Sequence, residues 1–206
     1  MALPKLKDIQ WVTTDCYGTL IDWETGLWAA LEPVLKRHGQ AVGREAALEL
    51  FGPLEAEQEH GTYKTYRQVL GETLKGIGAK LGFKPSDDEV KAFGASVGDW
   101  PAFPDSAEAL ARLHRRFKLA PITNCDDDLF ALSAERLGVD FDWVITAQQA
   151  GAYKPSPRPF ELAFERIDAP RERILHVAQS LFHDHVTAKE LGMTTVWIDQ
   201  IGRAHV

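Results

Sequence analysis

Short apolar runs alternate with helical patterns through the second half of the chain, which leaves few folds open to it. These runs lie at 118–123, 143–146, 174–178 and 194–199, and a fifth lies apart at 9–15. Short runs rich in Val, Ile and Leu are typical of parallel strands buried on both faces. Strands that alternate with helices predict an α/β fold with a doubly wound, five-stranded parallel sheet.

The segments between these runs carry helix signals. Asp105 and Glu108 have the spacing of a capping box, and the aspartates at 126–128 are candidate caps for the next helix. Gly138 and Gly192 stand where helices would end. The apolar spacing predicts helices over 105–117, 126–137, 160–167 and 186–191.

The interval 22–100 breaks the alternation and contains no convincing strand. Apolar residues within 27–35, 63–81 and 90–97 recur at helical spacing. We therefore expect an all-helical insertion at 22–100, within a core formed by 1–21 and 101–206. Two prolines in the 100–104 run predict the return hinge, because Pro resists both a helix and a central strand.

Composition excludes several classes of protein. The 206 residues include 23 Lys and Arg against 30 Asp and Glu, a formal net charge of −7, whereas nucleic-acid binders usually present a basic face. Cys16 and Cys125 are too few for a disulfide framework, so we expect two buried thiols. The sequence shows neither a signal-peptide pattern nor an apolar membrane span. These features predict a cytoplasmic protein without a nucleic-acid or membrane partner.

Polar side chains follow several of the predicted strands. Because ligands bind beyond the carboxyl ends of parallel strands, these side chains should converge on one crevice. A carboxylate, a hydroxyl–amide pair, a lysine and a second carboxylate together suit the activation of a nucleophilic Asp. The residues concerned are Asp15, Thr19, Thr123, Asn124, Lys154, Ser180 and Asp184.

These segments resemble a known family. In order, Asp15-x-Tyr17-Gly18-Thr19-Leu20, Thr123-Asn124, Lys154-Pro155 and Asp184 match the four motifs of the haloacid dehalogenase superfamily. The resemblance spans the chain and implies a Rossmann-like core with a helical cap inserted after the first motif. Phosphatases of this superfamily carry a second Asp two residues after the nucleophile. Tyr17 occupies that position here, as in the 2-haloacid dehalogenases.

The resemblance implies hydrolytic dehalogenation of a small 2-haloacid through a covalent aspartyl ester, by a cofactor-free homodimer. Asp15 would be the nucleophile, Lys154 would hold it, and Asp184 would orient Lys154 and assist the hydrolytic water. Thr123 would bind the substrate carboxylate and Asn124 the halide. The full set of implied substrate-binding residues is Tyr17, Thr19, Thr123, Asn124 and Ser180.

The chemistry of the residues favours the same branch. Halide is a weak base that leaves without a proton, so its displacement needs neither a general acid nor a metal. Phosphoryl transfer needs charge neutralisation, usually by Mg²⁺, and a proton donor for the leaving oxygen. A lysine at 154 beside Asp15 would lower the pKa of that carboxyl group and favour the ionised nucleophile.

Two departures from the dehalogenase pattern keep other functions open. The stretch 50–54 lacks the family's cap arginine, and one extra residue separates 178–180 from Asp184. One alternative is a Mg²⁺-dependent phosphatase with Asp15 and Asp184 as metal ligands, and another is a non-catalytic relative that binds small anions. His183 and His185 lack a third ligand at suitable spacing, so we interpret them as solvated or supporting side chains.

Overall fold

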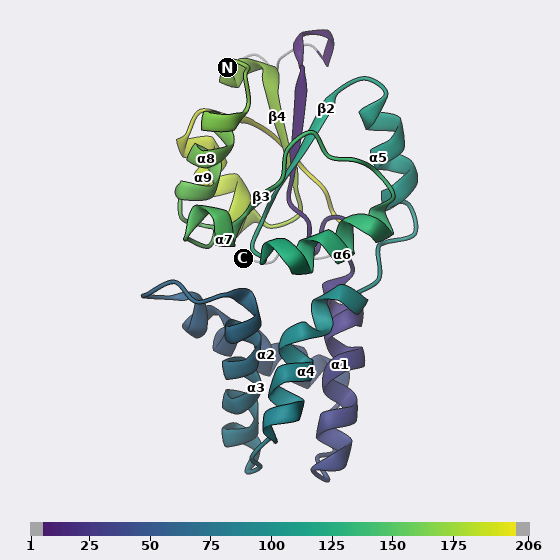
Figure 1. Cartoon of the computed structure of the whole chain (residues 1–206), viewed down its shortest axis with the longest axis vertical. Coiled ribbons are helices and arrows are strands. Elements are labelled where there is room, and N and C mark those ends of the chain that lie inside the picture. Colours follow the sequence, from purple (N-terminus) through teal and green to yellow (C-terminus); the bar gives the residue numbers. More distant parts are fainter. Residues whose placement is uncertain (1–5, 201–206) are drawn as a thin grey trace. The chain divides into compact units, whose positions relative to one another are not determined.

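The computed structural model describes residues 6–200 and divides into two compact units. The first unit, Met1–Asp22 with Ala102–Val206, contains a five-stranded, all-parallel sheet in the order β3-β2-β1-β4-β5 (Figure 1). The predicted α/β fold with a five-stranded parallel sheet is confirmed. The strands are β1 (Trp11–Thr14), β2 (Lys118–Thr123), β3 (Ile145–Thr146), β4 (Ile174–Ala178) and β5 (Thr194–Trp197).

Strand β3 is shorter than its sequence predicts, because the prediction began at Trp143. The chain before β3 contacts β2 at Leu119 without regular pairing: the Leu119 N–H donates to the Asp142 carboxylate at 2.9 Å, and the Leu119 carbonyl accepts the Asp142 N–H at 2.9 Å. The regular ladder therefore begins only where Ile145 pairs with Ile122. Trp143 stays 43% exposed at this edge, under the Arg166 guanidinium.

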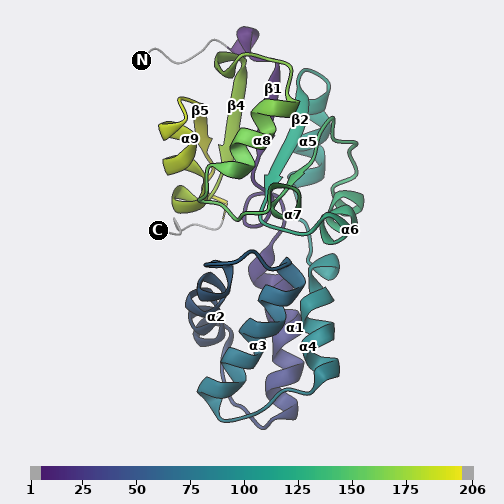
Figure 2. The ribbon, with the colours of Figure 1, turned by 60° about the vertical axis from the view of Figure 1, so that its left-hand side comes forward.

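Helices cover both faces of the sheet. Helix α8 packs against β2 and β3, and helix α9 against β5, around a core that includes Phe160, Ile122 and Ile174. Helix α5 lies on the other side, as the two ribbon views show (Figures 1 and 2). The helices of this unit are α5 (Ser106–His114), α6 (Asp127–Leu137), α7 (Ala147–Ala150), α8 (Arg158–Arg166) and α9 (Val186–Glu190), with 3₁₀ turns at Leu6–Asp8 and Arg171–Arg173 and a π-helix, η4, at Leu181–His185.

One predicted cap is wrong. Asp105 precedes α5, but its backbone is in the helical region (φ −96°, ψ −12°) and its side chain makes no capping hydrogen bond. A capping side chain needs an extended backbone to reach the first free N–H groups, so the capping box with Glu108 does not form. Gly138 does end α6 in the left-handed conformation (φ 65°), as predicted.

The second unit, Trp23–Pro101, is helical throughout its regular structure. Thr65 and Ser86 each begin a helix with a capping box, completed by Gln68 and Glu89. The boundaries at 22/23 and 101/102 lie one residue after the predicted ones. The helices are α1 (Trp23–Arg37), α2 (Arg44–Glu59), α3 (Tyr66–Leu81) and α4 (Asp87–Ala95), followed by a 3₁₀ turn at Ser96–Asp99.

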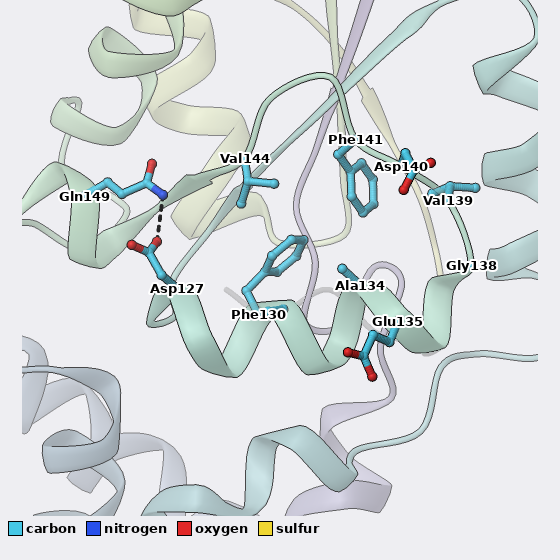
Figure 3. A pocket seen from close by; sticks show the side chains of 11 residues that line it. Asp127, Phe130, Ala134, Glu135, Gly138, Val139, Asp140, Phe141, Val144 and Gln149 are labelled. Atoms are coloured by element: carbon cyan, nitrogen blue, oxygen red, sulfur yellow. Dashed lines mark hydrogen bonds between the residues drawn. The ribbon is translucent and has the colours of Figure 1, made fainter.

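None of the helices formed by residues 6–200 combines the length and the apolar character that crossing a membrane requires. A surface pocket of about 510 Å³ lies beside α6 and the 138–144 loop (Figure 3). Phe130 and Phe141 supply apolar walls, while Asp127 at one end is held by Gln149. None of the predicted site residues lines this pocket.

Candidate active site

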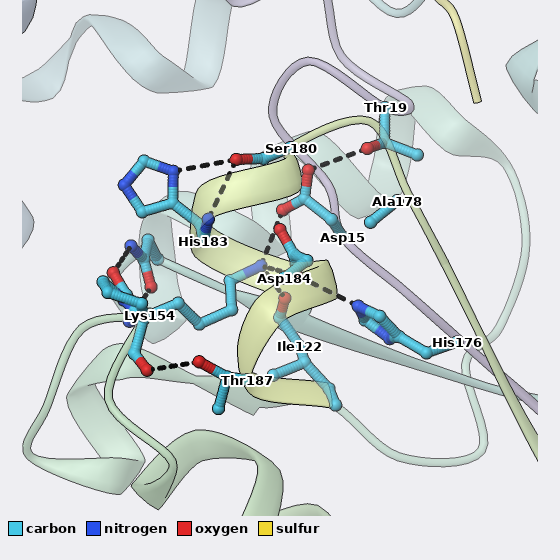
Figure 4. A network of polar contacts seen from close by, with 12 residues as sticks. Asp15, Thr19, Ile122, Lys154, His176, Ala178, Ser180, His183, Asp184 and Thr187 are labelled. Atoms are coloured by element: carbon cyan, nitrogen blue, oxygen red, sulfur yellow. Dashed lines mark hydrogen bonds and ion pairs between the residues drawn. The ribbon is translucent and has the colours of Figure 1, made fainter. Parts of the chain in front are cut away.

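The carboxyl ends of the central strands bring the predicted charged residues together (Figure 4). Asp15 directly follows β1, and Asp184 lies in η4, shortly after β4. Lys154 comes from the segment between α7 and α8 and is buried between the two carboxylates, with a side chain 2% exposed. Segments far apart in sequence therefore form one charged cluster, as the parallel topology predicts.

The Lys154 ammonium donates three hydrogen bonds. Its acceptors are Asp15 Oδ1 at 2.8 Å, Asp184 Oδ1 at 2.7 Å and the Ile122 carbonyl at 2.8 Å. Burial alone would favour the neutral amine, but the two carboxylates outweigh it and raise the pKa of Lys154 above its ordinary value. The lysine is therefore a fixed positive charge shared by two acids.

Asp15 has both carboxylate oxygens engaged. Oδ1 accepts from Lys154, and Oδ2 accepts the Thr19 hydroxyl at 2.8 Å. The Thr19 oxygen in turn accepts the Gln179 backbone N–H at 3.0 Å. The turn that returns Thr19 to Asp15 passes through Gly18, whose φ of 94° strongly favours glycine. The predicted substrate-binding Thr19 is thus a direct partner of the candidate nucleophile.

Asp184 is fully buried, and its two oxygens differ. Oδ1 accepts from Lys154 and lies 3.0 Å from His176 Nε2. Burial would raise the pKa of Asp184, but Lys154 and His176 overcome that effect and lower it to about 2. Oδ2 is buried and has no hydrogen-bond partner within residues 6–200. The acid is therefore ionised near neutral pH, with one oxygen available to a ligand or water.

A π-helix presents Asp184. In η4 the His185 N–H meets the Ser180 carbonyl at 3.4 Å, and the Val186 N–H bonds to the Leu181 carbonyl, so each bond spans five residues. A π turn holds one residue more than an α turn. This geometry accommodates the extra residue before Asp184 that distinguishes the sequence from the dehalogenase pattern.

Thr123 is the last residue of β2 and Asn124 follows it, and their side chains have different surroundings. The Asn124 side chain bonds the Lys154 backbone twice, accepting its N–H at 2.7 Å and donating to its carbonyl at 3.0 Å. This pairing fixes the segment that carries the lysine. The Thr123 hydroxyl is buried without a hydrogen-bond partner in the described part of the chain, so it is available to a bound molecule.

Tyr17 is directed toward α6. Its hydroxyl donates to Cys125 Sγ at 3.3 Å and lies 3.0 Å from Ser133 Oγ. Burial raises the pKa of Tyr17, so the phenol stays protonated at neutral pH. Cys16 and Cys125 are free, buried thiols, as predicted.

Ser180 and the two neighbouring histidines pair locally. Ser180 Oγ lies 3.1 Å from His183 Nδ1 and also accepts the His183 N–H, which caps η4. His185 Nε2 lies 2.9 Å from the Ala178 carbonyl. No group of three or more His, Cys, Asp or Glu side chains within residues 6–200 is arranged to hold a metal ion. The interpretation of these histidines as supporting side chains agrees with these contacts.

Comparison with known proteins identifies the family. A family model of haloacid dehalogenase-like hydrolases matches residues 9–191. The chain belongs to this family. The (S)-2-haloacid dehalogenase of Pseudomonas putida is 25% identical over 199 residues, which cover 95% of this chain and 86% of that enzyme. The predicted superfamily membership and hydrolase class are confirmed.

Solved structures share the fold of this haloacid dehalogenase-like hydrolase. The L-2-haloacid dehalogenase from Xanthobacter autotrophicus with chloropropionic acid covalently bound has a TM-score of 0.79 at 23% identity, covering 92% of this chain and 77% of that one. The magnesium-bound HAD hydrolase YfnB from Bacillus subtilis has a TM-score of 0.81 at 16% identity, covering 96% and 92%. At these identities the likeness concerns the fold, which suits either chemistry.

The sequence assigned no role to three residues at the site of this haloacid dehalogenase-like hydrolase, namely Gln179, His176 and Thr13. Gln179 bonds Thr19 through its backbone, and His176 links Thr13 to Asp184. A backbone contact leaves no signal in the sequence. The available signal for His176 was a lone polar residue in the middle of a buried apolar run.

The stretch 50–54 lies within α2, where the dehalogenase pattern would supply an arginine. The nearby Arg44 is engaged within the helical unit, with Nη2 3.2 Å from Thr25 Oγ1 and 3.8 Å from Glu24 Oε2. Neither the stretch 50–54 nor Arg44 therefore takes the place of the family's cap arginine.

Proposed function

We propose that the protein hydrolyses the carbon–halogen bond of a small 2-haloacid through a covalent ester on Asp15. The observation that carries this proposal is the environment of Asp15, whose carboxylate is held by the Lys154 ammonium and the Thr19 hydroxyl. These two donors fix the Asp15 carboxylate at the carboxyl end of β1, in a position from which it can act as a nucleophile. Tyr17 supplies no acid to protonate a leaving oxygen, and a departing halide needs none.

The reaction has two halves. In the first, an Asp15 oxygen attacks the carbon that bears the halogen; the new carbon–oxygen bond forms as the carbon–halogen bond breaks, and halide leaves with the bonding pair. In the second, water attacks the ester carbonyl and Asp184 accepts one proton of that water. The acyl carbon–oxygen bond then breaks, the leaving alkoxide takes the remaining proton of the attacking water to become the 2-hydroxy acid, and the Asp15 carboxylate is regenerated as Asp184 returns its proton to solvent. Lys154 compensates the changing charge of both carboxylates throughout.

Substrate contacts follow from the unused polar groups. The buried Thr123 hydroxyl has no partner in the described chain, and a substrate carboxylate would satisfy it. Ser180 lies at the start of η4 on the same sheet edge. Asn124, whose amide holds Lys154, would act mainly on the position of the lysine rather than on the halide.

Labelling tests the nucleophile. A single turnover with 2-chloropropionate in ¹⁸O-water should place label in the Asp15 peptide, because water attacks the ester at the enzyme's carboxyl carbon. Label found only in the product would contradict the covalent route. An Asp15→Asn protein, checked by mass spectrometry for deamidation, should release no halide, and sustained turnover by it would exclude Asp15 as the nucleophile.

The Mg²⁺-dependent phosphatase is the second candidate, favoured by the partnerless Oδ2 of Asp184. Asp15 and Asp184 would hold the ion, which would neutralise phosphate charge. Halide release from 2-chloropropionate that survives EDTA supports the dehalogenase. Metal-dependent phosphate release from an aryl phosphate, without halide release, supports the phosphatase. Stabilisation by small carboxylates without any turnover would indicate the non-catalytic relative.

Several broader features belong to the same proposal. The enzyme would act on a small molecule without a cofactor, in the cytoplasm, with the helical unit as its cap. It would form a homodimer, since two-fold dimers are the commonest soluble oligomers. Sedimentation at micromolar concentration tests this, and a lone monomer there would contradict it.

A further inference from the structure

His176 is a fully buried imidazole in the interior of the sheet. It lies on β4 directly opposite Thr13 of β1, and the Thr13 hydroxyl is 2.9 Å from His176 Nδ1. Phe160 packs edge-on against the ring at a centroid distance of 5.2 Å. An imidazole among apolar neighbours is costly unless both nitrogens are hydrogen-bonded, and His176 satisfies both.

The partners of His176 determine where its proton lies. An ionised Asp184 can only accept, so the contact between Nε2 and Oδ1 at 3.0 Å requires a proton on Nε2. In the neutral ring Nδ1 is then an acceptor, and the Thr13 hydroxyl donates to it. Asp184 therefore sets the tautomer, and the Thr13 hydroxyl, which can donate or accept, completes it by donating to Nδ1.

This donor completes an asymmetric environment around Asp184. His176 and Lys154 both bond Oδ1, which fixes the carboxylate plane and leaves Oδ2 without a protein partner in the described chain. A buried carboxylate oxygen in a polar site calls for an outside donor, and water is the available one. The two bonds to Oδ1 thus oppose rotation of the carboxylate and keep Oδ2 in one position.

We infer that His176 is a positioning residue for the hydrolytic half of the reaction: by holding Asp184 through Oδ1, it aims Oδ2 at the water that cleaves the Asp15 ester. This inference rests on the proposed function. Lys154 touches both carboxylates and so affects both halves. His176 touches only Asp184 of this pair, so its loss should spare halide release and slow ester hydrolysis.

Two matched variants separate these effects. His176→Leu removes the donor, whereas His176→Gln places an amide N–H near the position of Nε2. With 2-chloropropionate, His176→Leu should keep a rapid burst of about one halide per enzyme, followed by steady release roughly 10–100-fold slower than wild type. Acid-quenched samples should contain accumulated Asp15 ester. His176→Gln should recover steady release to within a few-fold of wild type.

Other outcomes overturn the inference. If His176→Leu slows the burst and the steady phase equally without ester accumulation, or leaves both unchanged, His176 does not position the hydrolytic step. Absence of halide release by wild type would instead refute the proposed function. Nitrogen-15 NMR of the wild-type imidazole then still tests the contact, as it does where His176→Leu fails to fold. A His176 ring without a proton on Nε2, or one unaffected by Asp184→Asn, would contradict the assigned donor.

Discussion

Two carboxyl groups, the fully buried Asp184 in the sheet unit and the half-buried Glu55 in the helical unit, meet opposite electrostatic conditions. Asp184 in the sheet unit contacts a lysine and a histidine, and its pKa falls to about 2 although burial acts in the other direction. Glu55 in α2 accepts the Tyr66 hydroxyl at 2.5 Å, and desolvation raises its pKa to about 7 despite that bond. Charged partners, more than burial, decide which acid is ionised.

The two groups therefore link stability to pH with opposite signs. Asp184 has a folded pKa below its ordinary 3.8, so its contribution is present above about pH 4 and is lost as the pH falls toward 2. Glu55 has a folded pKa above its ordinary 4.5, so its contribution is present below that value and is lost as the pH rises through about 7. Protonation of Asp184 therefore lowers the free energy of unfolding at acid pH, whereas ionisation of Glu55 lowers the free energy of unfolding as the pH rises.

Lys154→Met should have the largest effect, because it removes the partner that distinguishes Asp184 from Glu55. Two buried carboxylates would lose their shared cation, which typically costs about 3–5 kcal/mol of the free energy of unfolding. The pKa of Asp184 should rise, and its acid-side loss of stability should begin at higher pH. Halide release should fall on the order of 10²–10⁴-fold.

Urea unfolding at several pH values and halide release against pH measure both effects. Lys189→Met is a suitable control, because Lys189 is an exposed lysine of α9 in the same unit. It should change neither quantity appreciably. A Lys154→Met protein with wild-type stability and activity would show that the shared cation has no role in either.

Glu55→Gln should have an intermediate effect confined to the alkaline side. The amide cannot ionise, so the variant should match wild type near pH 4 and exceed its stability at pH 8 by about 2–3 kcal/mol. Urea unfolding at these two pH values measures the difference. Glu57→Gln alters an exposed neighbour on the same helix and should leave the slope unchanged. Equal pH slopes for wild type and Glu55→Gln would mean that Glu55 is already ionised at neutral pH in the folded protein.

The sequence predicts the sheet unit well because its pattern is local. Strands β2 and β4 begin and end at the predicted residues, since short apolar runs bounded by turn residues are explicit in the sequence. The cap at Asp105 failed because the spacing of its side chains says nothing about backbone dihedrals. Helix α2 had no predicted counterpart, since few of its residues are buried and its apolar stripe is weak.

In the candidate site, too, some features could be predicted from the sequence and others could not. Asp15, Lys154 and Asp184 could be predicted to converge because parallel strands end at one edge. The contact between Thr13 and His176 joins residues 163 positions apart, and it depends on the register of β1 against β4. A single sequence does not specify that register. The direction of Tyr17 toward Cys125 likewise depends on how α6 packs.

Arg37→Met should have the smallest effect, although its contact resembles that of Lys154. Arg37 Nε lies 2.9 Å from Glu89 Oε1, close to the 2.8 Å between Lys154 and Asp15, but the Arg37 side chain is 61% exposed. Water stabilises the two separated, exposed ions almost as well as the ions stabilise each other in the pair. Glu89 also keeps His38 and Ser86 as partners. We expect a loss below about 1 kcal/mol that shrinks further in high salt.

Urea unfolding at low and high ionic strength tests this expectation, with Lys36→Met as a matched change at another exposed ion pair of α1. A loss for Arg37→Met comparable to that for Lys154→Met would mean that contact distance governs the strength of both pairs. A small loss that salt removes would assign the difference to the burial of Lys154 between two carboxylates, since the Arg37–Glu89 and Lys154–Asp15 contacts are alike in length.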